Sequence, residues 1–194
     1  MRNINTPFDI RPLRNFLQVA STIFDNNFGP AILAWCSMYS MNIYRKVLQD
    51  VRHFNLPVLY GLPTVGKTLI AQCGAWLNGC SDLHIASRCT LAFVTTWLTS
   101  SSLPFVWDDP ACSEEVAQLA VDLANGAVRG KSGEDVKTPL TGCLVTANFD
   151  LSILYKFFSR LVVFPISTIN RQKETGDARL VEDLARMASS AFPD

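Results

Sequence analysis

Residues 61–68, GLPTVGKT, constrain the fold of this chain more than any other stretch of its sequence. They follow the apolar run LPVLY (56–60), which predicts a buried strand, and they lead into GKTLIAQCGAWLNG (66–79), which predicts a helix. A glycine, four residues and Gly-Lys-Thr arise by chance in about one chain of this length in a hundred. The position between strand and helix therefore carries the argument, because there the backbone N–H groups can wrap phosphates at a helix N-terminus.

Four residues of this loop have properties that suit phosphate binding. Lys67 would contact the β- and γ-phosphates of a nucleotide, and the Thr68 hydroxyl would ligate Mg²⁺. Gly61 permits the turn, and Gly66 permits a close approach of the backbone to the phosphates. The predicted nucleotide-binding residues are Gly61, Leu62, Pro63, Thr64, Val65, Gly66, Lys67 and Thr68. The alternative interpretation is a glycine-rich turn with a solvated lysine.

A second apolar run, FVWDDP (105–110), ends in two acids. Acids at the carboxyl end of a buried strand point into the crevice where open α/β sheets bind ligands. Asp108 would hold the Mg²⁺ shell, and Asp109 would orient or deprotonate the attacking water. The alternative is a simple turn, since Asp-Asp-Pro is also good turn chemistry.

The third candidate is Asn148, at the end of the apolar run in LVTANFD (144–150). Its amide could hydrogen-bond both the γ-phosphate and the attacking water. An isolated asparagine after a strand is more commonly a turn former. Its place after the phosphate loop and the acidic strand favours the role of a polar sensor.

Composition limits the classes of protein that the chain can belong to. Seventeen basic and seventeen acidic residues cancel, which excludes a protein that coats DNA through its overall charge. Six scattered cysteines without a C-x-x-C pair, and only two histidines, argue against a zinc site and for buried thiols in a reducing compartment. No signal-peptide pattern is visible, so we expect an intracellular, soluble protein of the nucleus or cytoplasm. The charge-free stretches 26–44 and 89–107 favour core elements over membrane spans.

Strand and helix patterns alternate along the chain, which predicts an α/β fold with a mostly parallel central sheet flanked by helices. Residues 1–15 predict an extended lead-in, and 16–54 predict two helices, the second with Pro30 in its first turn. Strand and helix remain open for much of 83–100. We expect an N-terminal helical segment (1–54) and a nucleotide-binding core (55–194) within one structural domain.

Four further elements complete this expectation. Residues 113–125 predict a helix with Ser113 as its N-cap and Gly126 beyond its end. The runs PLTGCLVTANFD (139–150) and SRLVVFPI (159–166) each contain a strand. The tail from Asp177 predicts an amphipathic helix.

In this order, GLPTVGKT, FVWDDP, LVTANFD and SRLVVFPI resemble the core of the superfamily 3 helicases and related AAA+ ATPases. The resemblance covers residues 56–166, and the helical segment before them fits the small helical lead-in of such domains. It implies Mg²⁺-dependent ATP hydrolysis in a homo-oligomeric ring, commonly a hexamer, that translocates along single-stranded nucleic acid. No membrane association is implied.

The resemblance also assigns roles to individual residues. Lys67 and Thr68 match the Walker A pair, and the two aspartates after Trp107 match the acidic Walker B pair. Asn148 matches the motif C asparagine, although Ala147 stands where the family usually has Ser or Thr. Arg160 falls at the arginine finger, which would reach a neighbouring subunit's γ-phosphate. The alternative for Arg160 is a surface salt-bridge partner at a strand start.

A basic loop precedes motif C in these ATPases and projects into the channel of the ring. The matching segment is VRGKSGEDVKT (128–138). Its candidate nucleic-acid-binding residues are Arg129, Lys131 and Lys137, and Arg129 is also a second candidate for the finger. The segment also holds two acids and no aromatic residue for base stacking, so a merely solvated loop is the alternative.

Two other functions remain open at this point. The first is a nucleotide-dependent switch or scaffold that remodels protein partners. The second is a small-molecule P-loop kinase, which needs an arginine-bearing lid over the phosphates. The one candidate for such a lid, RQKETGDAR (171–179), comes after the last predicted strand.

Overall fold

The computed structural model describes residues 10–126, 138–149, 157–167 and 176–189. Within these residues, five strands form one sheet in the order β2-β3-β4-β1-β5, and every neighbouring pair is parallel. The strands are β1 (Leu56–Tyr60), β2 (Ile85–Ser87), β3 (Phe105–Asp108), β4 (Cys143–Ala147) and β5 (Leu161–Pro165). The expected α/β fold is confirmed, and the sheet is parallel throughout.

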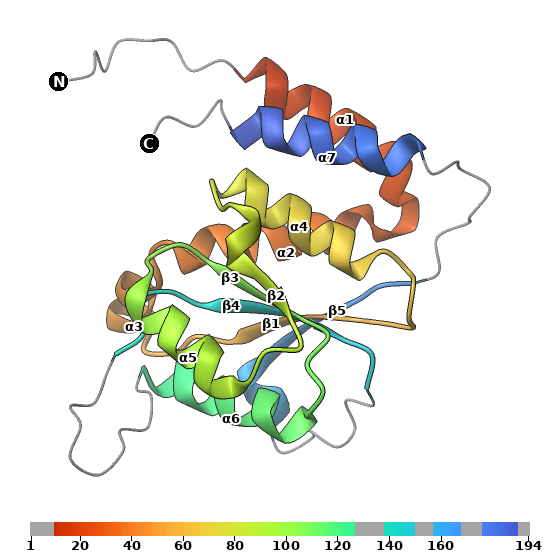
Figure 1. The fold of residues 1–194 in the computed structure, drawn as a ribbon. Helices are drawn as coiled ribbons and strands as arrows, with labels where there is room; N and C mark the ends of the chain where they lie inside the picture. Colours follow the sequence, from red (N-terminus) through yellow and green to blue (C-terminus); the bar gives the residue numbers. More distant parts are fainter. Residues whose placement is uncertain (1–9, 127–137, 150–156, 168–175, 190–194) are drawn as a thin grey trace, which may run out of the picture.

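Helices cover both faces of the sheet (Figure 1). On one side lie four helices: α1 (Arg11–Phe24), α2 (Phe28–Met41), α4 (Lys67–Leu77) and α7 (Gly176–Ser189). On the other side lie α5 (Leu91–Ser100) and α6 (Ser113–Asn125). α1 and α7 run side by side outside α4, with α7 contacting both of the other helices. This double cover buries both faces of the central strands, as their almost uninterrupted apolar sequences require.

The first half of the chain shares its hydrophobic core with the sheet. Phe16 and Phe24 of α1 pack edge-on or tilted against Trp35 of α2, with ring centroids 5.1 and 5.9 Å apart. The Trp35 Nε1 donates a hydrogen bond of 2.8 Å to the carbonyl of Ile70 in α4. One contiguous apolar cluster therefore joins the N-terminal helices to the phosphate-loop helix.

Two expectations for the N-terminal segment are wrong. Residues 11–15 are helical, because Pro12 lies in the first turn of α1, where its missing N–H costs no hydrogen bond. Residues 16–54 contain three α-helices rather than two, because α2 ends at Met41 and a separate helix, α3 (Tyr44–Val51), follows it. Pro30 does fall in the first turn of α2, as expected.

The open region 83–100 contains both kinds of element. Ile85–Ser87 is β2 at the edge of the sheet, and Leu91–Ser100 is α5, which Thr90 caps by accepting a hydrogen bond of 3.3 Å from the Phe93 N–H. The expected N-cap of α6 is displaced by one residue, because Cys112 holds that position and Ser113 is already helical. Gly126 ends α6 in the left-handed conformation, as expected.

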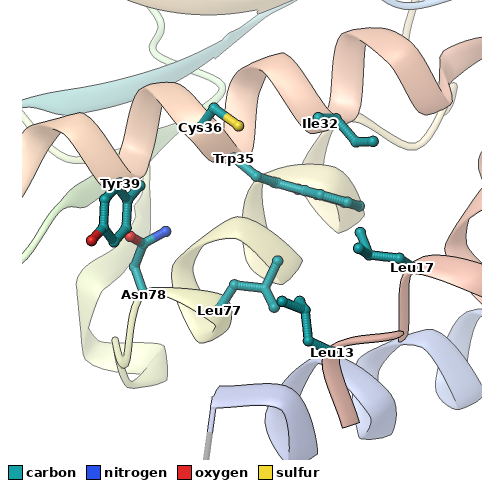
Figure 2. Close-up of a pocket in the computed structure, with 8 residues that line it drawn as sticks. All are labelled: Leu13, Leu17, Ile32, Trp35, Cys36, Tyr39, Leu77 and Asn78. Atoms are coloured by element: carbon teal, nitrogen blue, oxygen red, sulfur yellow. The ribbon is translucent and has the colours of Figure 1, made fainter. Parts of the chain in front are cut away.

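An apolar pocket of about 230 Å³ lies where α1, α2 and the end of α4 meet. Figure 2 shows the Trp35 ring, Leu13 and Leu77 directed toward its interior. Its lining residues are Leu13, Leu17, Ile32, Trp35, Cys36, Tyr39, Leu77 and Asn78. In the part of the chain that the structure covers, no helix combines the length and apolarity that a membrane crossing needs.

Candidate nucleotide site

A second cavity, of about 350 Å³, lies at the carboxyl ends of the central strands. It is enclosed by the loop after β1, the first turn of α4 and the ends of β3 and β4. Its lining residues are Pro63, Thr64, Gly66, Lys67, Thr68, Asp108, Asp109, Thr146 and Asn148. Three separate sequence motifs therefore meet in one place, because parallel strands bring their carboxyl ends to the same edge of a sheet.

Two glycines of the loop between β1 and α4 occupy positions where a side chain would not fit well: Gly66 because of its backbone conformation, and Gly61 because of a close contact. Gly66 is the N-cap of α4 at φ 94°, a left-handed conformation that a side chain rarely adopts. A Cβ atom built on Gly61 would lie 2.3 Å from the carbonyl oxygen of Ile166, just after β5. Val65 is buried beside Gly61, whereas Leu62 is exposed. The loop is thus held between the end of β5 and the start of α4.

Lys67 is folded into the loop. Its side chain is only 5% exposed, and its Nζ donates hydrogen bonds to the carbonyls of Gly61 (2.9 Å) and Leu62 (2.7 Å). Burial lowers the pKa of this ammonium, while the nearby carboxylates of Asp109 and Asp108 act to raise it. The structure therefore places one buried cation beside two acids in the cavity.

Thr68 and Asp108 are in direct contact. The Thr68 hydroxyl donates a hydrogen bond of 2.9 Å to Oδ1 of Asp108. A hydroxyl and a carboxylate are oxygen ligands of the kind Mg²⁺ takes, and Mg²⁺ is usually held by one or two such groups together with phosphates and water. The described residues contain no group of three or more His, Cys, Asp or Glu side chains placed to hold a metal by themselves. The donor set therefore fits a magnesium ion that arrives with a nucleotide.

Asp109 and Asn148 are in direct contact at the wall of the cavity. The Asn148 Nδ2 donates a hydrogen bond to Oδ1 of Asp109, so these two candidate residues lie together although they are 39 residues apart in the sequence. Asp109 has φ 51°, in the left-handed region, where aspartate and asparagine are among the non-glycine residues most often found.

Thr146 also lines this cavity, although it was not among the residues predicted from the sequence. The position expected to carry a hydroxyl was that of Ala147, the immediate neighbour of Asn148. Side chains alternate along a strand, so the residue two positions before Asn148 lies on the same face of β4. That period of two was the signal that could have identified Thr146.

Of the remaining candidates, Arg160 is the one that the structure describes, and it is not brought to this cavity. Arg160 directly precedes β5, and the register pairs the first residue of β5 with the first residue of β1. It therefore lies at the amino-terminal edge of the sheet, about 16 Å away by strand length alone. Its side chain has no ion-pair or hydrogen-bond partner among the residues that the structure describes. Arg129, Lys131 and Lys137 lie outside the described residues.

No protein-family model matches the chain, and no curated protein matches it significantly in sequence. Among solved structures, it is similar to one titled "SCCmec type IV Cch - active helicase", with a TM-score of 0.55 and 14% identity over 84% of this chain. It also matches the A-form apo structure of the NrS-1 C-terminal region (TM-score 0.49, 10% identity, 93% of this chain and 44% of that chain). A third match is the inhibitor-bound JCV helicase (TM-score 0.47, 12% identity, 94% of this chain and 59% of that chain).

The chain spans 34% of the first of these structures, about a third of its length. At such low identity the likeness to this structure bears on the fold alone, and it agrees with the parallel sheet described above. The chain has a P-loop NTPase fold like that of a helicase, with a parallel five-stranded sheet flanked by helices and N-terminal helices before it.

Proposed function

We propose that this chain binds Mg²⁺-ATP in the cavity between its phosphate loop and the ends of β3 and β4, and hydrolyses it. The observation that carries the proposal is the direct hydrogen bond from Thr68 to Asp108 beside Lys67. It joins the proposed magnesium ligands of two motifs that lie 40 residues apart in the sequence. A solvated glycine-rich turn or an isolated Asp-Asp-Pro turn would need no such contact.

The residues of the chain divide the chemistry among them. The amides at the start of α4, which lack a side-chain cap, and the Lys67 ammonium would bind the phosphates. Thr68 and Asp108 would hold magnesium, which neutralises phosphate charge when bound. Asn148 engages Oδ1 of Asp109, which leaves Oδ2 to take the proton of the attacking water.

We further propose that this ATPase is a motor of the superfamily 3 helicase type that acts on single-stranded nucleic acid as a homo-oligomeric ring. The order of the motifs and the helicase-like fold support this proposal. Arg160 lies at the opposite edge of the sheet from the cavity of its own chain, so an arginine finger at this position would have to act on a neighbouring copy. The basic residues of segment 128–138 would track the phosphates of the strand.

A nucleotide-dependent switch that remodels protein partners is the second candidate. The observation that favours it is the balance of seventeen basic and seventeen acidic residues, since a strong nucleic-acid motor commonly carries a basic surface. Both candidates share the cavity and the chemistry described above. They differ in what the hydrolysis is coupled to.

The test is an ATPase assay with and without single-stranded DNA or RNA, with Lys67→Ala as the inactive variant. Lys46→Ala is its matched control, because Lys46 is an exposed lysine whose only described ion pair is with Asp50. We expect turnover in the wild type and in Lys46→Ala, loss of turnover in Lys67→Ala, and stimulation by single strands. Turnover without stimulation favours the switch, and no turnover in the wild type overturns the proposal. A mass measurement with a non-hydrolysable ATP analogue tests the ring.

A further inference from the structure

Thr146 is a buried polar residue in the most enclosed strand of the sheet. Its side chain is 1% exposed, and β4 lies between β1 and β3. The other residues of β4 are a cysteine, a leucine, a valine and an alanine, all buried. A valine would fill the same space without burying a hydroxyl, which costs free energy unless it is hydrogen-bonded. A buried hydroxyl at this position therefore calls for an explanation.

The hydrogen bonds of Thr146 connect the two acids that follow Trp107. Its Oγ1 lies 2.8 Å from Oδ1 of Asp108 and 2.9 Å from the backbone N of Asp109. A backbone N–H can only donate, so the hydroxyl oxygen accepts from Asp109 and its single hydrogen points to Asp108. The direction of both bonds is fixed by chemistry, and the bond to the carboxylate is charge-assisted.

This connection restrains each acid in a different way. Oδ1 of Asp108 accepts hydrogen bonds from the hydroxyls of both Thr68 and Thr146, which fixes the rotation of the carboxylate and directs Oδ2 elsewhere. Asp109 holds φ 51°, and the bond from its N–H to Thr146 helps to retain that conformation. The single hydroxyl of Thr146 thus restrains both the carboxylate of Asp108 and the backbone of Asp109.

We infer that Thr146 is a positioning residue of the proposed ATPase site, whose hydroxyl holds Asp108 toward the magnesium position and Asp109 toward the attacking water. The inference rests on the proposed function. Thr146 itself need not touch the nucleotide, since both of its bonds go to the acids. It acts through them.

Two substitutions separate this role from simple packing. Thr146→Val keeps the branched shape and removes the hydroxyl, whereas Thr146→Ser keeps the hydroxyl and removes the methyl group. If the hydroxyl positions the acids, kcat falls about ten- to a hundredfold in the valine variant, as expected for small misplacements at a reacting centre. The serine variant then stays within about threefold of wild type. If Thr146 only fills space, the order is reversed, because valine suits a buried strand and serine leaves a cavity.

A binding measurement gives a readout that does not depend on turnover. With a fluorescent, non-hydrolysable ATP analogue, we expect the valine variant to need about tenfold more Mg²⁺ for half-maximal binding, because Asp108 is no longer held by a hydrogen bond from residue 146. Affinity for the analogue without Mg²⁺ should be unchanged. Thr141→Val is the matched control, since Thr141 is also buried and its hydroxyl donates only to the Met41 carbonyl (3.1 Å). We expect it to alter neither kcat nor the Mg²⁺ requirement.

The outcomes separate this inference from the proposed function. Absence of ATP hydrolysis in the wild type refutes the proposed function and the inference with it. Wild-type kcat and Mg²⁺ dependence in Thr146→Val, with turnover intact in the wild type, refute the inference alone. Equal losses in the serine and valine variants also refute it. Thermal unfolding checks that each variant folds, and Thr146→Ala, which also lacks the hydroxyl, replaces the valine variant if that one does not.

Discussion

Substituting alanine for Gly61 tests the contact that places the phosphate loop against β5. The added Cβ would lie 2.3 Å from the Ile166 carbonyl oxygen and 3.3 Å from its carbonyl carbon. These are backbone atoms, so no side chain can rotate away. The Ile166 N–H also donates a hydrogen bond of 2.7 Å to the Tyr60 carbonyl, which ties this backbone to the end of β1.

The size of the effect follows from the distance. An ordinary contact begins at 3.4 Å, so the loop and the backbone after β5 must separate by about 1 Å. Overpacking of this kind costs about 1–3 kcal/mol in the free energy of unfolding. For a chain of this length, that lowers Tm by about 2–12 °C. The same shift moves the Gly61 carbonyl that accepts a hydrogen bond from Lys67, and a misplacement of about 1 Å can cost a hundredfold in turnover.

The assay pairs thermal unfolding with ATP turnover, and Gly79→Ala is the control. Gly79 follows α4 at φ 74°, with no heavy atom within 4 Å of its built Cβ. An alanine there costs about 1–2 kcal/mol of backbone strain but lies away from the cavity. We expect a lower Tm in both variants, and a lower rate of ATP turnover in Gly61→Ala alone. Wild-type Tm and turnover in Gly61→Ala would refute the close approach of β5 to the loop.

Asp109→Asn should leave nucleotide binding intact and lower turnover at least tenfold, since general-base chemistry contributes about 10²–10⁴; binding and steady-state rates measure this. Arg160→Ala subunits should be inactive alone and regain some ATPase activity when mixed with Lys67→Ala subunits, because the arginine would act on a neighbour's cavity. Burial raises the pKa of the Cys80 thiol to about 12. The unfolded chain releases that proton above about pH 8.5 and the folded chain does not, so the free energy of unfolding should fall with rising pH. Cys80→Ala should remove about 1.4 kcal/mol per pH unit of that dependence, measured by urea unfolding between pH 7 and 10.

Each of these expectations has an outcome that contradicts it. Unchanged turnover in Asp109→Asn would remove that carboxylate from the chemistry. Mixed subunits that stay inactive would exclude an Arg160 finger in trans, and the geometry of β5 already separates it from its own cavity. Identical pH dependence in wild type and Cys80→Ala would show that the thiol titrates in the folded chain as it does in the unfolded chain.

The sequence predicted those parts of the fold that local patterns determine. The strand 56–60 was predicted residue for residue, because five apolar residues end at a glycine that begins the loop. The three motifs of the cavity were predicted from their order along the chain, and the parallel sheet places their residues together. The chemical roles of those residues stay predictions.

The errors arose where distant contacts decide the structure. Residues 11–15 are helical although the two prolines and mixed polar residues of 1–15 obscure the pattern, and the helix that they begin packs along α7. The two residues between α2 and α3 include no glycine or proline, so the sequence gives no signal that the helix ends there. The alternation of side chains along β4 could have identified Thr146 as a residue of the cavity, but not its hydrogen bonds to Asp108, at the end of β3, and to Asp109, just after it. Such pairings appear only when the register of β3 and β4 is known.

The strand order has a consequence for how the protein is made on the ribosome. β4 is inserted between β1 and β3, although both of those strands leave the ribosome before it. A nascent chain that ends at Gly142 already contains the phosphate loop, Asp108 and Asp109. It still lacks β4, the strand that joins β1 to β3. The next few residues form β4, which joins the two strands and supplies Asn148, so the cavity can be completed only after both of the other strands have been made.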